Sequence, residues 1–311
     1  MDQKMEKNKN KSCLQICFEE ILKYWNLNSD FLIFQIFGID YCNRLNSDAI
    51  YKKFRPGQIG HFTDFCSNIY GLEFYRYYNA LEFVKNIKRG IRCNYKIMAG
   101  FDNFYLPWGN TFQKVHLIHF FNILDIDEKG NILCYDGYNE KYSEKLDVDN
   151  FIKGYKSGYY ITKTKKSTEN IDKLFEFISK KIKIDENVKA YEMLINELSN
   201  VKSYEELFES SDTNSCEVII VTKMIINYEK MKLKILQENM CNREIYECVY
   251  QIVQRWDNIL NLLLYLRYSR KIKEKVIVTI TRKIKEICDY QVYEWKIIKN
   301  TQVINAGNTM A

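Results

Sequence analysis

The hydrophobic pattern of this chain changes once, near residue 163, from a mixture of helical and strand periods to a purely helical one. Before that point, alternating segments such as 72–78 predict strands, and apolar residues spaced three and four apart predict helices. After it, helical spacing continues without a strand-like segment. The sequence therefore predicts an α+β domain at 1–163, followed by an all-α helical bundle domain at 164–311.

Within 1–163, helical segments come early and strand-like segments follow them. The expected helices and strands are listed here in chain order: helices at 12–25, 31–37 and 60–70, a strand at 72–78, a helix at 79–89, a strand at 95–101, a hairpin of 119–126 and 132–135, a helix at 148–155 and a strand at 158–162. A turn of the type Asp-Glu-Lys-Gly at 127–130 joins the hairpin strands. This order predicts an antiparallel sheet with helices packed on it.

Two apolar stripes in the second half predict the core of a helical bundle. One consists of Trp256, Ile259, Leu260, Leu263 and Leu264, and the other contains Ile280, Ile284 and Ile287. Stripes at this spacing are typical of buried helix faces. A homodimer formed through such a stripe is left open.

The charges are nearly balanced, with 46 Lys and Arg against 40 Asp and Glu, and they are spread along the chain. This pattern does not favour nucleic-acid binding, whereas an acidic protein partner stays possible. No apolar run of about 18 residues is present, so no membrane span is expected. Because the first residues lack the apolar core of a signal peptide and the 10 cysteines form no C-x-x-C pair, we expect a cytoplasmic protein with free thiols.

Cys13 is placed where a thiol becomes reactive. It follows Ser12, a favourable N-cap residue, at the start of the helix expected at 12–25. The backbone N–H groups and the dipole of a first helical turn favour thiolate over thiol, and the thiolate is the nucleophile. Cys13 is therefore the candidate nucleophile.

The hairpin supplies a candidate base and a candidate partner for it. His119 opens one strand, and Asp136 ends the other, 17 residues later, so that the two ends come back beside each other. An imidazole between a thiol and a carboxylate follows the logic of a catalytic triad. His116 remains an alternative base, while a metal site is not favoured because no local carboxylate or cysteine completes a ligand set with the two histidines.

The order Cys13, His119, Asp136 and their surroundings resembles the papain-like superfamily. The segment from Cys13 to Trp25 is similar to the nucleophile helix of the bacteriocin-leader peptidases. The segment Asp-Asn-Phe-Tyr-Leu-Pro-Trp at 102–108, followed by Lys-x-His-x-x-His at 114–119, resembles the N-terminal family typified by the butirosin side-chain acyltransferase. The resemblance extends to the amide-forming cysteine-protease homologues of polythioamide assembly. It covers 1–163 well and the helical half only in architecture.

The resemblance implies an amide-forming N-acyltransferase of thiotemplated natural-product biosynthesis. Cys13 would take an acyl or peptidyl group from a carrier-protein thioester and pass it to a small amine, such as a diamine. Such an enzyme needs no cofactor of its own, because the phosphopantetheine arm belongs to the acyl or peptidyl carrier protein. A run of basic residues is available to bind an acidic carrier, or else forms a solvated helix face: Arg267, Arg270, Lys271, Lys273 and Lys275.

Two departures from the leader peptidases concern the site itself. Those enzymes carry a Gln shortly before the nucleophile that helps to form the oxyanion hole. Here the nearest candidates are Gln3, Asn8 and Asn10, none at a matching distance, and Asp136 is followed by Gly137 instead of Pro. A cysteine peptidase or hydrolase, and a non-catalytic binding protein on a papain-like frame, are the alternative functions.

Overall fold

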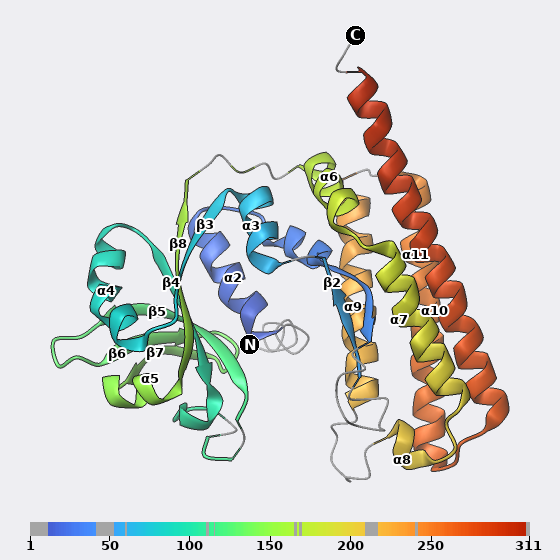
Figure 1. Ribbon diagram of the computed structural model, residues 1–311, viewed down its shortest axis with the longest axis horizontal. Helices are drawn as coiled ribbons and strands as arrows, with labels where there is room; N and C mark the ends of the chain where they lie inside the picture. The colour runs from blue at the N-terminus through green and yellow to red at the C-terminus, as the bar shows by residue number, and fades with distance from the viewer. Residues whose placement is uncertain are drawn as a thin grey trace. The chain divides into compact units, whose positions relative to one another are not determined.

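The computed structural model describes residues 12–41, 53–59, 61–109, 112–114, 116–164, 167, 170–208, 217–239 and 242–308. The chain divides into two units (Figure 1). The first unit comprises 1–29 and 66–169, and the second comprises 30–65 and 170–311. The expected single boundary near residue 163 is therefore replaced by a division in which 30–65 belongs with the helical half.

A six-stranded antiparallel sheet forms the centre of the first unit, in the order β3-β8-β4-β5-β6-β7. The strands are β3 (Leu72–Tyr77), β4 (Lys96–Asp102), β5 (Ile118–Ile126), β6 (Ile132–Asp136), β7 (Lys141–Leu146) and β8 (Tyr155–Lys163). The combination of helices with an antiparallel sheet confirms the expected α+β fold class. The sequence analysis missed β7, a polar edge strand whose alternation is weak.

Helices lie on both faces of this sheet (Figure 1). They are α2 (Cys13–Tyr24), α4 (Ala80–Arg92), the short 3-10 helix η3 (Asn103–Tyr105) and α5 (Val148–Gly154). On one face, α4 and α5 enclose a buried aromatic core that includes Phe83, Phe121 and Phe151. On the other, α2 packs against β5, and the Phe18 ring lies 5.8 Å from that of Phe74. Helix α3 (Phe62–Tyr70) begins in the second unit and ends in the first.

The second unit is a helical bundle that also contains a small sheet. Its helices are α6 (Ile171–Lys181), α7 (Ile184–Ser199), α8 (Tyr204–Leu207), α9 (Glu217–Glu238), α10 (Arg243–Ser269) and α11 (Glu274–Asn308). Both predicted stripes contribute to its core: Trp256, Ile259 and Leu263 are buried on α10, and Ile280, Ile284 and Ile287 are buried on α11. The helices α6 to α11 confirm the prediction that residues after 170 are mainly helical.

The bundle is not all-α, because the antiparallel strands β1 (Ile36–Tyr41) and β2 (Phe54–Gln58) belong to this unit. Strand β1 packs against α7 and β2 against α9, and the Lys53 ammonium lies 3.0 Å from the Glu197 carboxylate. The helix expected at 31–37 is instead the 3-10 helix η1 (Ser29–Gln35), and β1 begins directly after it. An apolar run without clear periodicity does not distinguish a helix from a buried strand.

A buried ionic cluster lies between α9 and α11. The Lys232 ammonium is 2.7 Å from the Glu229 carboxylate and 3.8 Å from that of Glu294. Burial raises the pKa of Glu294 to about 7 against the opposing effect of Lys232.

No helix of the described residues combines the length and the apolarity that crossing a bilayer requires.

Candidate active site

Helix α2 begins at the predicted nucleophile. Ser12 is its N-cap: its hydroxyl accepts a hydrogen bond from the Gln15 N–H at 3.2 Å, and the Gln15 side chain accepts one from the Ser12 N–H at 3.0 Å. This capping box fixes the point at which the helix starts. Cys13 is therefore the first helical residue, and its thiol is partly exposed.

The hairpin brings His119 and Asp136 together. His119 Nε2 lies 2.8 Å from Asp136 Oδ2, and both side chains are buried. The Cys13 thiol interacts with the same imidazole, which lowers the pKa of the thiol. Because Nε2 faces Asp136, Nδ1 is the ring nitrogen left for the thiol. The structure thus assembles all three residues that the sequence analysis selected.

A β-bulge decides which face of the hairpin carries Asp136. Near the turn, Asp125 is opposite Leu133, but beyond Leu124 the register shifts by one, and Asn122 is opposite Tyr135. Continuing that register places Asp136 opposite Phe121, on the face that His119 also occupies. Without the extra residue, Asp136 would be opposite Asn122 and would face away from the imidazole.

Asp136 is fully buried and accepts hydrogen bonds from three other groups. The Trp108 indole N–H donates to its Oδ2 at 3.0 Å, the Asn139 side-chain amide donates to Oδ2 at 2.8 Å, and the Asn139 N–H donates to Oδ1 at 3.2 Å. These bonds orient the carboxylate and keep it ionised, so Trp108 and Asn139 are positioning residues. Sequence reasoning missed these roles, although Trp108 ends the aromatic segment that the resemblance singled out.

The three groups shift one another's pKa in a consistent direction. Burial opposes ionisation of Asp136, but the hydrogen bonds and charge of His119 outweigh it and lower the Asp136 pKa. Burial likewise disfavours a charged imidazole, yet Asp136 and Cys13 raise the pKa of His119 to about 9. Burial also opposes the Cys13 thiolate, and the hydrogen bond and charge of His119 outweigh it and lower the Cys13 pKa. The charges therefore favour a thiolate–imidazolium pair.

Close contacts hold α2 against the hairpin strands. The Asn122 side-chain amide on β5 donates to the Cys17 carbonyl at 3.1 Å. After β6, a Cβ added to Gly137 would lie 2.8 Å from the Cγ2 atom of Ile16, so a glycine is needed for this approach. Gly137, which departs from the leader-peptidase pattern, thus has a packing reason here.

The other two histidines lie elsewhere. His116 is stacked on Phe104, with ring centroids 4.3 Å apart, and its Nδ1 lies 2.9 Å from the Asp102 carboxylate. Its side chain is largely exposed, and it has a different carboxylate partner from His119. His61 is exposed and lies in the second unit. His119, not His116, is therefore the histidine placed at Cys13.

Apolar side chains are exposed next to the histidine. Leu117 and Ile118 precede His119 and are 54% and 64% exposed, and the half-exposed Tyr138 ring lies edge-on to His119 at 5.7 Å.

Within the described ranges no cluster of three His, Cys, Asp or Glu side chains is arranged to hold a metal ion. The oxyanion candidates Gln3, Asn8 and Asn10 lie outside the residues that the structure describes.

No protein-family model matches the chain, and no curated protein sequence is significantly similar to it.

The altered thiol pKa predicts selective alkylation of Cys13. Iodoacetamide should modify the partly buried Cys13 faster than the exposed Cys93 at neutral pH, because thiolate, not exposure, limits this reaction. The rate at Cys13 should rise through a pKa below the ordinary thiol value, and His119→Gln should move that inflection upward. Peptide mass spectrometry over a pH series measures both rates; equal rates at Cys13 and Cys93 would contradict the prediction.

Proposed function

We propose that this protein is a papain-like cysteine acyltransferase that forms amide bonds, taking an acyl or peptidyl group from a carrier-protein thioester. The observation that carries the proposal is the grouping of Cys13, His119 and Asp136, in which His119 Nε2 lies 2.8 Å from Asp136 Oδ2 and His119 lowers the Cys13 pKa. This arrangement suits nucleophilic attack on an activated carbonyl. The choice of thioester donor and amine acceptor rests on the resemblance of 102–119 to the butirosin-type family.

In the first step, the Cys13 thiolate attacks the thioester carbonyl. The C–S bond to the phosphopantetheine arm breaks, and the His119 imidazolium gives its proton to the departing thiolate. The products are an acyl-Cys13 thioester, a neutral imidazole and a free carrier thiol. Exchange of one thioester for another is nearly balanced in energy, which suits a thiol nucleophile.

In the second step, an amine attacks the acyl-Cys13 carbonyl while neutral His119 accepts a proton from the nitrogen. Collapse of the tetrahedral intermediate breaks the C–S bond, releases the amide and restores the thiolate–imidazolium pair. Asp136 stabilises the imidazolium at both stages and holds its orientation. We assign the Cys13 N–H to the developing oxyanion, because the first N–H groups of a helix have no intrahelical acceptor.

The half-exposed side chains of Leu117 and Tyr138, the second with its ring 5.7 Å from that of His119, support binding of an acyl chain beside His119. The hydrocarbon part of an acyl chain is apolar, so contact with it removes these side chains from water.

The partition between amine and water tests the proposed reaction. With an acyl-loaded carrier protein and an added diamine, amide should be the main product and free acid the minor one. Without amine, acyl-Cys13 should accumulate and be visible by intact mass. Free acid as the main product in the presence of saturating amine would favour the hydrolase instead, and absence of any acyl adduct would contradict both.

We assign carrier binding to the turn between α10 and α11. Arg270, Lys271, Lys273 and Lys275 are exposed there, beside Tyr268, which is 83% exposed. Acidic surfaces are attracted to such a group of cations, and exposed charges act mainly on the association rate.

Charge reversal tests this surface. The double variant K271E/K275E should raise KM for the acyl-carrier about fivefold or more and leave kcat unchanged, because it weakens encounter without touching the thiol. The matched control K189E/K202E reverses two exposed lysines elsewhere on the second unit. Steady-state kinetics at low and high salt measure the effect; equal changes in both variants would argue against a localised carrier surface.

A further inference from the structure

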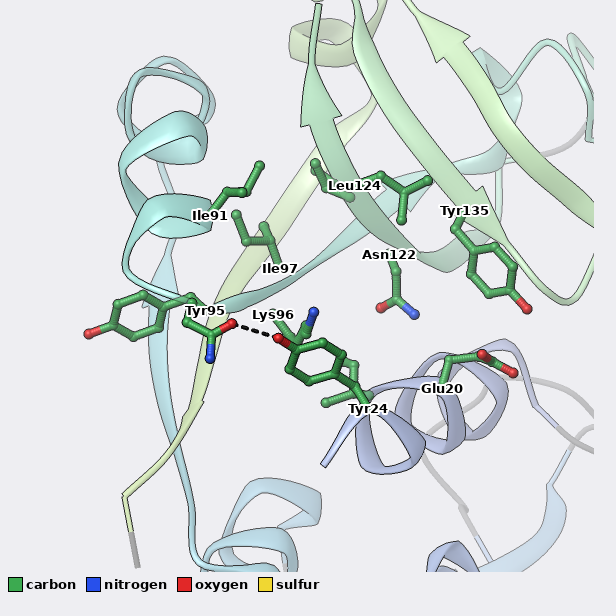
Figure 2. Close-up of a pocket in the computed structure, with 12 residues that line it drawn as sticks. Glu20, Tyr24, Ile91, Tyr95, Lys96, Ile97, Asn122, Leu124 and Tyr135 are labelled. Carbon is green, nitrogen blue, oxygen red and sulfur yellow. Dashed lines mark hydrogen bonds between the residues drawn. The ribbon is translucent and has the colours of Figure 1, made fainter. Parts of the chain in front are cut away.

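A cavity lies at the other end of α2 from Cys13. It has a volume of about 410 Å³ and is formed within the first unit by α2, the end of α4, β4 and the β5–β6 hairpin (Figure 2). Its lining on α2 includes Glu20 and Tyr24, seven and eleven residues beyond Cys13. At the helical rise this is roughly 10 and 16 Å along the axis, so the cavity is separate from the thiol.

One wall carries a buried hydrogen-bond acceptor without a partner. Asn122 is 8% exposed, and its side-chain nitrogen donates to the Cys17 carbonyl. Within the described part of the chain, its Oδ1 atom has no hydrogen-bond partner. That oxygen is on the side of the cavity where Lys96 lies (Figure 2). A buried acceptor of this kind is costly unless a ligand or water donates to it.

Opposite charges line the same cavity. The Lys96 ammonium lies over the Tyr24 ring, 3.1 Å from its centroid, and no ion pair joins it to another described residue. The Glu20 carboxylate is near the Tyr135 hydroxyl, and burial together with the Glu20 charge raises the Tyr135 pKa. A simple anion would be repelled by Glu20 and a simple cation by Lys96, whereas a zwitterion satisfies both.

The remaining lining includes the apolar side chains of Ile97, Ile123 and Leu124, and a further polar residue, Asn94, whose Oδ1 accepts a hydrogen bond from the Tyr24 hydroxyl at 2.8 Å. A hydrophobic side chain of the ligand would be accommodated by the apolar residues. The volume lies in the range typical of small-molecule sites. The cavity therefore combines one cation, one carboxylate, one unpartnered amide oxygen and an apolar wall.

We propose that this cavity binds a free α-amino acid with an apolar side chain. The ligand carboxylate pairs with Lys96, its ammonium donates to Asn122 Oδ1 and faces Glu20, and its side chain contacts Ile97 and Leu124. Binding here is independent of the acyl chemistry at Cys13, although both sites use α2.

Isothermal titration calorimetry tests the proposal on the intact chain with leucine, methionine and phenylalanine. At least one of them should bind, and its N-acetyl and amide derivatives should each bind about tenfold more weakly or worse, because each lacks one of the two charges. Lys96→Met should weaken binding by a similar factor, and Glu20→Gln should weaken it as well. The matched control Lys88→Met removes an exposed lysine of α4 and should leave the affinity unchanged.

Absence of binding by all three amino acids at millimolar concentration would overturn the proposal, as would equal affinity for the neutralised derivatives or an undiminished affinity of a folded Lys96→Met variant. Circular dichroism and thermal melting verify that each variant is folded. The measurement requires no acyl donor and no reactive thiol, so its failure is distinguishable from failure of the acyltransferase proposal.

Discussion

Replacing Cys13 with alanine is expected to abolish formation of the acyl-enzyme and to reduce amide formation at least about 1,000-fold. The reason is that the neighbouring thiol cannot replace it: burial raises the pKa of Cys17, one turn further along α2, well above its ordinary value. Intact-mass measurement after mixing with an acyl-loaded carrier protein detects the adduct, and product analysis measures the amide.

The matched control is Cys93→Ala, which removes an exposed thiol of the same unit and should acylate like the wild type. Thermal melting of both variants separates loss of chemistry from loss of fold. A Cys13→Ala protein that still forms amide at the wild-type rate would refute Cys13 as the nucleophile.

Replacing Asp136 with asparagine is expected to slow acyl transfer roughly 100- to 10,000-fold while the fold is retained. The amide preserves the shape but removes the charge that raises the His119 pKa to about 9. The imidazolium then loses its proton at lower pH, the thiolate loses its partner, and the Cys13 pKa returns toward the ordinary value. Steady-state rates and the pH dependence of Cys13 alkylation measure the two effects.

In the wild type, transfer activity should fall as pH rises through about 9, because His119 then loses the proton that it gives to the leaving thiolate. It should also fall at low pH, below the lowered pKa of Cys13, where the thiol is protonated. In Asp136→Asn, the loss of transfer activity at high pH should begin at a lower pH than in the wild type. The pH at which Cys13 alkylation reaches half its maximal rate should be higher. The pH range in which the enzyme is active therefore becomes narrower on both sides.

The chain offers a second histidine–carboxylate pair as the control for Asp136. Asp102 is buried and lies 2.9 Å from His116, the same kind of contact as in the candidate site. Asp102→Asn should therefore leave the alkylation inflection of Cys13 unchanged. If both Asp variants shifted it equally, a general effect on the sheet would replace the specific one.

Local signals were sufficient for much of this structure. The start of α2 was predictable because a capping box involves residues only three apart, and Ser12 and Gln15 make it without help from the rest of the chain. The β5–β6 hairpin was predictable from alternation on both sides of a turn. The cores of α10 and α11 followed from helical periodicity.

Non-local packing decided the division of the chain. Residues 30–65 precede most of the first unit in sequence, yet β1 and β2 pack on helices that follow about 150 residues later, as the Lys53–Glu197 pair illustrates with a separation of 144 residues. No pattern within 30–65 indicates its distant partner. The sequence therefore placed this segment with its neighbours in the chain, which was wrong.

The sequence by itself determined that a thiol begins a helix and that a histidine and a carboxylate lie near the open end of a hairpin. Only the tertiary structure decided that the carboxylate meets the histidine, because the bulge at Leu124 sets Asp136 on the face of Phe121 and His119. Trp108 and Asn139 then complete the hydrogen bonds of the buried Asp136. The physical reason is that caps and turns depend on neighbouring residues, whereas the face of a strand depends on a register that one additional residue reverses.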